Sequence, residues 1–300
     1  MDFIQATRHI FPFFKFFAII PFEISGPPCQ RQIHKNRKCF IIGNVFLAFA
    51  FCFMIYQLWV FSNMVVHLMS LVKLFGILMI LFTVLVGSIE ILRNNHKYIQ
   101  IYLEFMHISD SQPNCREFFE QILYFFIFKI SYFTVNFLFE YIFLFINMYY
   151  NNIFIKEVFA YASIEIFNFA LISHFHLSLI SSICILKSLN SNLLNFQFNF
   201  NSFNKLFNLL NKINSIYGLN LLIKIMDLFV SIVASIFQLI LSVIYSTEHD
   251  LVLDVYILVI IFNYFFQYLF LSSFLVQLLK REVWLFIYLF VSIFYFSNIK

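Results

Sequence analysis

Long apolar runs separated by short polar stretches dominate the chain. Six of them are long enough to cross a bilayer as helices, because a hydrocarbon core of about 30 Å takes about 20 helical residues. In chain order they are Phe40–Phe61, Val65–Leu92, Gln121–Met148, Ile153–Leu186, Gly218–Tyr245 and Leu251–Leu279. A seventh run, Val283–Phe296, would reach only about 21 Å as a helix. The pattern predicts an all-α, polytopic transmembrane helical bundle with six clear spans and a short seventh.

The stretch before the first run is also apolar, but Pro12, Lys15 and Pro21 interrupt it. Lys15 would break the apolar centre of a signal peptide, and no small-residue cleavage site follows. We therefore expect residues 1–39 to form a cytoplasmic or interfacial segment. Spans one to four then occupy residues 40–186.

Residues 187–217 are rich in Asn and carry an apolar residue at alternating steps of four and three. This repeat comprises Leu189, Leu193, Phe196, Phe200, Phe203, Phe207 and Leu210. It predicts an amphipathic helical stalk on the cytoplasmic side. Within it, Phe196, Phe200, Phe203 and Phe207 are the candidate assembly interface. An Asn-rich loop with chance Phe spacing is the alternative. Residues 218–300 hold spans five and six and the incomplete span seven.

Lys and Arg are distributed unevenly between the two sides of the predicted bundle. Fourteen lie before the first span, between spans two and three, between spans four and five, or directly after span six; only two lie on the other side. Because cytoplasmic segments carry the excess of positive charge, the N-terminus is predicted to be cytoplasmic. A G-protein-coupled receptor has its N-terminus outside, so this distribution argues against that class.

Composition excludes an ordinary soluble domain. Apolar residues make up 62% of the 300 residues and charged residues only 11%, against about 45–50% and 25% in soluble domains. No glycine-rich nucleotide loop occurs among the five glycines, and the net charge of +4 gives no reason to expect a nucleic-acid partner.

Enzyme and metal motifs are absent as well. The sequence contains no HExxH and no GxSxG, and no cofactor, metal or catalytic residue is expected. His174 and His176 are two residues apart, so they point to different helix faces and cannot chelate one ion together.

Polar and charged residues in the outer halves of spans three to six form the candidate ligand-binding site, because such residues are costly in lipid. They are Asn136, Glu140, Glu157, Tyr161, Glu165, Asn168, Gln238, Tyr256, Asn263 and Tyr264. One interpretation is a polar pocket open to the outside, shared by several helices. The other is a set of interhelical hydrogen bonds with interfacial tyrosines. Lys129, nearer the cytoplasmic end, is expected to snorkel.

Three segments carry a resemblance to a known family. They are the opening HIFPFFKFFAIIPFEIS, the stretch FNLLNKINSIYGLNLLIKIMDLFVSIV with its Tyr217-Gly218 pair, and KREVWLF after span six. Together with the order of the spans, they resemble the insect gustatory receptor family of seven-span chemosensory proteins.

The resemblance implies a ligand-gated, non-selective cation channel subunit for taste perception, multi-pass in the plasma membrane and assembled as a homo- or hetero-tetramer. Its ligand would be a small-molecule tastant bound among the outer helix halves, with the last helix lining the pore. The family's Thr-Tyr and Gln-Phe string in the last span is absent, so no pore residue is assigned, and we expect a chain truncated at its C-terminus. A secondary transporter and a non-conducting accessory or degenerate fragment are the alternatives. Ligand identity and ion selectivity stay open.

Overall fold

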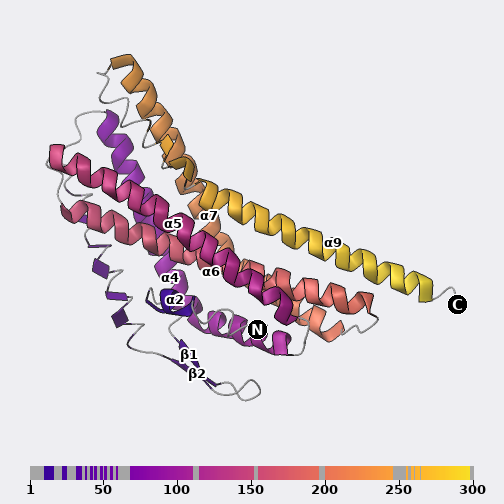
Figure 1. Cartoon of the computed structure of the whole chain (residues 1–300). Helices are drawn as coiled ribbons and strands as arrows, with labels where there is room; N and C mark the ends of the chain where they lie inside the picture. The colour runs from indigo at the N-terminus through magenta and orange to yellow at the C-terminus, as the bar shows by residue number, and fades with distance from the viewer. Residues whose placement is uncertain are drawn as a thin grey trace.

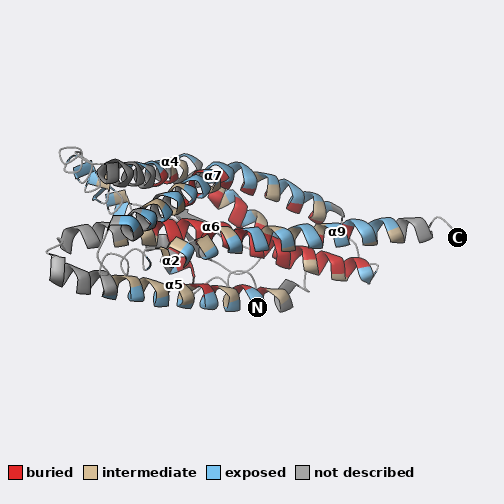
Figure 2. Ribbon diagram, turned by 90° about the horizontal axis from the view of Figure 1, so that it is seen from above, coloured by how far each residue is buried: buried red, intermediate tan, exposed pale blue. Residues whose placement is uncertain are grey.

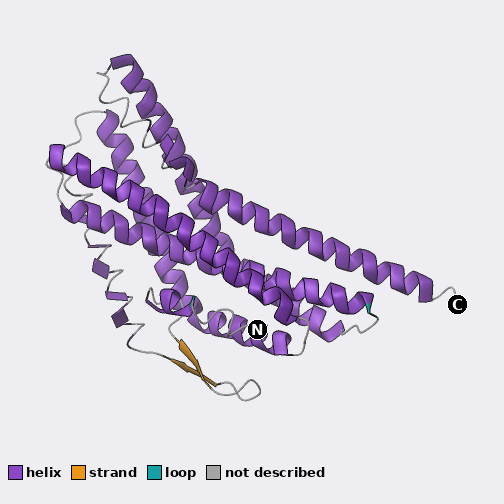
Figure 3. Cartoon of the chain, viewed as in Figure 1, coloured by secondary structure: helices purple, strands orange, loops and turns teal. Residues whose placement is uncertain are grey.

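The computed structural model describes residues 10–16, 22–25, 32–35, 38, scattered positions from 41 to 59, 68–110, 115–151, 155–195, 200–245, scattered positions from 255 to 265, and 266–297. Long helices make up nearly all of this part, as Figure 3 shows. The prediction of an all-helical bundle is confirmed at this level.

In the part of the chain that the structure describes, five long helices form the bundle (Figure 1). They are α4 (Leu68–Asp110), α5 (Cys115–Asn151), α6 (Ile155–Leu194), α7 (Phe200–Tyr245) and α9 (Leu271–Ser297), with the π-helical turn η2 (Phe266–Phe270) directly before α9. None of the five contains a proline, so nothing in the side chains forces a break. At 1.5 Å per residue, the 43 residues of α4 and the 46 of α7 reach about 65–70 Å, far beyond the thickness of a bilayer.

Helix α6 is the centre of the bundle. It contacts α4, α5, α7, α9 and the short helix α2 (Phe11–Phe16). In Figure 2, α6 is coloured buried over most of its length, whereas its neighbours each show an exposed face. Helix α6 carries polar side chains such as His174, His176 and Ser182 within its apolar sequence, and such groups are costly to expose to lipid. The surrounding helices shield them from lipid.

The exposed faces of the outer helices are apolar. On α5 they include Tyr124, Phe128, Val135 and Phe139, each more than half exposed. Within the described residues, two helical segments are long and apolar enough to cross a membrane: Phe118–Ile142, with a mean hydropathy of 1.7, and Glu165–Leu194, with 1.9. A third is obtained if Asn201–Leu219 and Leu221–Val230, which meet at an angle of 42°, form one bent span.

The structure thus supports two or three spans by length and composition, fewer than the six predicted, and membrane placement in that coarser sense. Four of the six lie partly outside the described residues: Phe40–Phe61 and Leu251–Leu279 at many positions, and Val65–Leu92 and Ile153–Leu186 at their first few. In α4, Glu90 lies near the end of the apolar run, and Arg93 and Lys97 follow that run within the same helix.

The predicted separate seventh span is wrong. Residues 283–296 belong to α9, which continues through Lys280, Arg281 and Glu282 without interruption. These charges do not end the helix, because Glu282 is buried and held by its neighbours. Its Oε2 accepts a hydrogen bond from Asn190 Nδ2 of α6 at 3.2 Å, and its Oε1 lies 3.1 Å from Arg281 Nη2.

The N-terminal segment folds onto the bundle. Phe11 and Phe14 of α2 are buried, and the Phe14 ring lies edge-on to Phe126 of α5, with centroids 6.4 Å apart. A small antiparallel hairpin follows, in which β1 (Phe22–Ser25) pairs with β2 (Gln32–Lys35) in the register Phe22 to Lys35. The sequence analysis expected a cytoplasmic or interfacial segment here, and predicted neither the packed helix nor the hairpin.

Candidate functional site

Two histidines on α6 lie at the centre of the buried polar groups. His174 and His176 are both fully shielded from solvent. Their separation of two residues turns them toward different helix pairs, as the sequence predicted. His174 meets tyrosines of α4 and α7, whereas His176 meets side chains of α5 and α9.

His174 is bonded at both ring nitrogens. The hydroxyl of Tyr102 from α4 lies 2.6 Å from Nε2, and the hydroxyl of Tyr217 from α7 bonds Nδ1. A neutral imidazole has one N–H and one acceptor nitrogen, so one tyrosine donates and the other accepts. Burial raises the pKa of Tyr102 well above its ordinary value, so its hydroxyl keeps its proton. This triad joins α4, α6 and α7.

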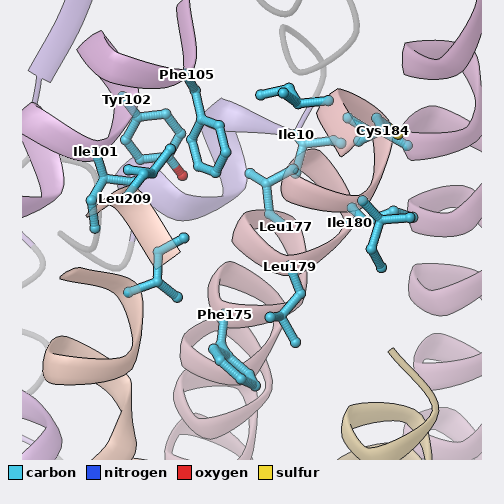
Figure 4. Close-up of a cluster of buried hydrophobic side chains, with 14 of the residues drawn as sticks. Ile10, Ile101, Tyr102, Phe105, Phe175, Leu177, Leu179, Ile180, Cys184 and Leu209 are labelled. Carbon is cyan, nitrogen blue, oxygen red and sulfur yellow. The ribbon is translucent and has the colours of Figure 1, made fainter. Parts of the chain in front are cut away.

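Aromatic rings enclose the triad. The rings of Phe14 and Tyr98 each lie edge-on to His174 with centroids 5.2 Å apart. The buried hydroxyl of Tyr98 has no hydrogen-bond partner among the described residues. Figure 4 shows Tyr102 packed beside Phe105 and Ile101 of the same helix, with Leu209 of α7 close by.

A second chain of hydrogen bonds starts at Lys129 of α5. Lys129 Nζ lies 2.7 Å from His176 Nδ1, and His176 Nε2 lies 2.8 Å from Ser272 Oγ of α9. Because Lys129 donates to Nδ1, the proton of the neutral ring resides on Nε2 and is donated to Ser272. Ser272 Oγ in turn donates to the backbone carbonyl of Tyr268 in η2. We call the side chains of Lys129, His176 and Ser272 the α5–α6–α9 chain.

The expectation that Lys129 snorkels is wrong. Its side chain is only 2% exposed, and its Nζ lies 5.1 Å from the centroid of the Phe169 ring. In the described part of the chain, no carboxylate forms an ion pair with it. The imidazole of His176 and the ring face of Phe169 solvate the Lys129 amine in place of water. The side chain therefore does not have to extend to the membrane interface.

Tyr268 of η2 contacts residues from several helices. It is 3% exposed and packs with Ile172 of α6 and Leu228 of α7. The amine of Lys224 from α7 lies 5.5 Å from the centroid of its ring. A π-helical turn has a strained backbone pattern that is frequent at functional sites, and the α5–α6–α9 chain ends on the backbone of this one.

Several predicted ligand-binding residues lie together, nearer the end of the bundle that is predicted to face outward. Glu165 of α6 accepts a hydrogen bond of 3.2 Å from Tyr141 of α5, and its charge interacts with those of Glu140 and Lys224. We call Glu140, Tyr141, Glu165 and Lys224 the outer polar cluster. The sequence identified its two carboxylates but not its tyrosine or its lysine.

Other predicted residues make local contacts. Asn263 accepts a hydrogen bond of 3.2 Å from Tyr132 of α5, and Asn136 donates to the backbone carbonyl of Tyr132 on its own helix. The first is an interhelical bond of the kind that the alternative interpretation expects, whereas the second stays within α5. Tyr256 and Tyr264, and the side chains of Glu157, Tyr161 and Gln238, lie outside what the structure describes.

A small cavity lies between the triad and the outer polar cluster. It has a volume of about 20 Å³ and is lined by Thr83, Asn168, Leu171, Ile172, Phe175, Tyr217, Leu221 and Lys224. That space suits about one water molecule, which needs about 10–15 Å³. A drug-sized ligand needs about 300 Å³ or more, so Asn168 lines a site too small for such a ligand in this conformation.

The predicted assembly residues fall into different environments. Phe203 stacks on Phe286 of α9 with ring centroids 4.0 Å apart, so it packs within the chain. Phe207 is 55% exposed. Phe200 begins α7, and Phe196 lies outside the described residues.

Four of the buried, hydrogen-bonded polar side chains are ones that the sequence analysis did not place in a site. His174 and His176 were judged only as metal ligands, and Tyr102 and Ser272 carry no motif. The spacing of the histidines was the available signal, since opposed faces of a central helix can bond two helix pairs. Among the described residues, no group of three or more His, Cys, Asp or Glu side chains could hold a metal ion.

Comparison with known proteins adds no assignment. No protein-family model matches the chain, and no curated protein is significantly similar to it.

Proposed function

We propose that this protein is a chemosensory receptor of the insect gustatory type, a ligand-gated, non-selective cation channel subunit of the plasma membrane. The resemblance of its three sequence segments supports this proposal. So does a bundle in which at least two helices could cross a membrane.

The proposed mechanism rests on two contacts of Tyr268, one at its ring and one at its backbone. Lys224, a member of the outer polar cluster, lies over its ring, and the α5–α6–α9 chain ends on its backbone carbonyl. A ligand that engages Glu165 or Lys224 would therefore act directly on η2 and on α9 beyond it. Binding favours the open state only by the difference in its affinity for the open and closed conformations.

The proposed topology has six spans, a cytoplasmic N-terminus and a last helix whose C-terminal half is cytoplasmic. Interhelical contacts support it, because residues assigned to the cytoplasmic side meet one another. Lys212 pairs with Glu104, and Lys187 donates to Gln121 at 2.9 Å. Tyr141 and Glu165, both assigned to the outer side, also meet.

Voltage-clamp recording from cells that express the chain tests the proposal. Cells are exposed to a panel of sugars and bitter alkaloids, and surface expression is measured in parallel. We expect an evoked current whose reversal potential follows the cation gradients. Tyr268→Ala should reduce this current at least about tenfold at equal surface expression, which corresponds to about 1.4 kcal/mol of lost coupling.

Tyr288→Ala is the matched control, because Tyr288 is a tyrosine of α9 that is 69% exposed. Its current should equal that of the original chain. Uptake of a panel compound without current would identify a secondary transporter. Surface expression with neither current nor uptake would support a non-conducting accessory subunit, and either result would overturn the channel proposal.

A further inference from the structure

A second, larger cavity lies between α4 and α7, away from the polar groups described above. Its volume is about 520 Å³, and its lining is Leu103, Glu104, His107, Ile108, Lys205, Asn208 and Lys212. Small-molecule sites have volumes of about 300–1,000 Å³. The cavity is therefore large enough for a metabolite, unlike the 20 Å³ space near Lys224.

The polar side chains around this cavity are mostly available for a ligand. Lys205, His107 and Asn208 are exposed and make no hydrogen bond or ion pair within the described part of the chain. Lys212 is paired with Glu104, and each of these two side chains is more than one-third exposed. Two lysines facing one carboxylate leave a net positive charge, with an amide and an imidazole as further donors.

The position of the cavity indicates where its ligand comes from. Glu104 and His107 lie between predicted spans two and three, and Lys205 and Lys212 lie between spans four and five. The proposed topology assigns both of these stretches to the cytoplasmic side. In that topology the cavity opens toward the cytoplasm.

We propose that this cavity binds a phosphate-bearing organic anion from the cytoplasm. Lysine amines bind phosphate as compact point charges, and the amide of Asn208 and the ring of His107 can each donate to further oxygens. Leu103 and Ile108 supply an apolar wall for the organic part of the ligand. The site lies outside the outer polar cluster and does not depend on ion conduction, so it goes beyond the proposed function.

Substitution of Glu104 should have the opposite effect on anion binding from substitution of a lysine in the cavity. Its carboxylate holds Lys212 and repels an incoming anion. Glu104→Gln would release Lys212 and remove the repulsion, so it should tighten binding. Lys205→Gln removes an unpaired positive charge and should weaken it. Opposite effects of two single-charge substitutions are not expected from nonspecific association.

The first test uses the purified full chain in detergent with inorganic pyrophosphate as the probe, at constant ionic strength. Acetylation of individual lysines is followed by mass spectrometry. Pyrophosphate should slow the acetylation of Lys205 about fivefold, the size expected for one charge contact in a water-accessible site. Lys280, an exposed lysine of α9 outside the cavity, should be unaffected.

Titration calorimetry with the same probe then compares the variants. Glu104→Gln should lower the dissociation constant and Lys205→Gln should raise it, each about fivefold. Lys280→Gln should leave it unchanged. Equal protection of Lys205 and Lys280, or no protection of either, would overturn the proposal.

A final comparison separates the two sources of phosphate. The full chain is placed in nanodiscs of phosphatidylcholine with or without phosphatidylinositol bisphosphate, and Lys205 acetylation is measured again. Protection by pyrophosphate in both kinds of nanodisc, with none from the lipid alone, supports the soluble ligand. Protection by the lipid alone would assign the phosphate to a headgroup and overturn the cytoplasmic source.

Discussion

Burial of the two histidines on α6 is possible because each one bonds side chains of two neighbouring helices. A buried polar group costs about 1–3 kcal/mol when it is left unpaired. His174 uses both ring nitrogens for α4 and α7, and His176 uses both for α5 and α9. At the residue scale, these bonds fix which face of α6 meets which neighbour, where apolar packing alone would allow rotation.

Substitution of His176 should therefore destabilise the protein more than substitution of Lys129. His176→Leu leaves a buried amine without its acceptor, and we expect the unfolding temperature in detergent to fall by about 5 °C or more. Lys129→Met leaves only a neutral ring nitrogen unpaired and keeps an unbranched stem, so its effect should be smaller. Thermal unfolding followed by circular dichroism measures both.

The double variant is the control for this pair. If the loss in His176→Leu arises from the stranded amine, adding Lys129→Met should restore most of the stability. Additive losses, or a His176→Leu variant as stable as the original chain, would contradict the hydrogen bond between these residues. His96→Leu changes an exposed histidine of α4 and should have little effect.

At the element scale, Gly87 sets how closely α4 approaches α6. A Cβ atom at this position would lie 3.2 Å from Leu171 Cδ2 and 3.6 Å from Phe167 Cε1. Small residues allow close backbone approach between helices in membranes. The other glycine for comparison, Gly218, is exposed, and its Cβ would lie 3.7 Å from Asn214 Oδ1 of its own helix.

Gly87→Val should destabilise the bundle by about 1–3 kcal/mol, the usual cost of overpacking. The same substitution at Gly218 places its Cβ at an ordinary contact distance on an exposed face and should be nearly neutral, since valine favours a helix more than glycine does. Thermal unfolding of both variants in one detergent compares them. Equal unfolding temperatures would show that α4 and α6 are not in close contact at Gly87.

Much of the helical architecture could be predicted from the sequence, because long apolar runs without proline leave few alternatives. The sequence did not predict that span six and residues 283–296 belong to one helix. The two were separated because of the charges of Lys280, Arg281 and Glu282. In the fold, Glu282 has a buried partner, Asn190, which the sequence does not reveal. Lys129 was misplaced for the same reason, since its acceptor on α6 is 47 residues away in the chain.

The candidate site was predictable only in part. Glu140 and Glu165 were identified because charges inside apolar runs are rare and costly, and the structure brings them together. Their other partners, Tyr141 and Lys224, follow from the rotation of α5 and α7, which the weak periodicity of nearly all-apolar helices does not fix. Hydrophobic patterning finds the faces of a helix only where polar residues mark one side.

At the scale of the whole molecule, the helices continue beyond the bundle and pack against one another there. α4 and α7 exceed the thickness of a bilayer, and Phe203 of α7 stacks on Phe286 of α9 in this extension. Phe207 lies one turn further along α7 and is exposed. The apolar repeat thus contains one residue that stabilises the subunit and another that is free to contact a second copy.

Phe203→Ser and Phe207→Ser separate these two roles. Phe203→Ser removes the stack on Phe286 and should lower the unfolding temperature of the chain, with a loss of about 1–3 kcal/mol. Phe207→Ser removes an exposed ring and should leave that temperature unchanged, but lower the oligomer fraction measured by size exclusion with light scattering. An elution profile unchanged by Phe207→Ser would exclude this face of α7 as the assembly interface. The tetramer of the proposed channel would then have to form through another surface, for which the exposed apolar side of α9 around Trp284 is available.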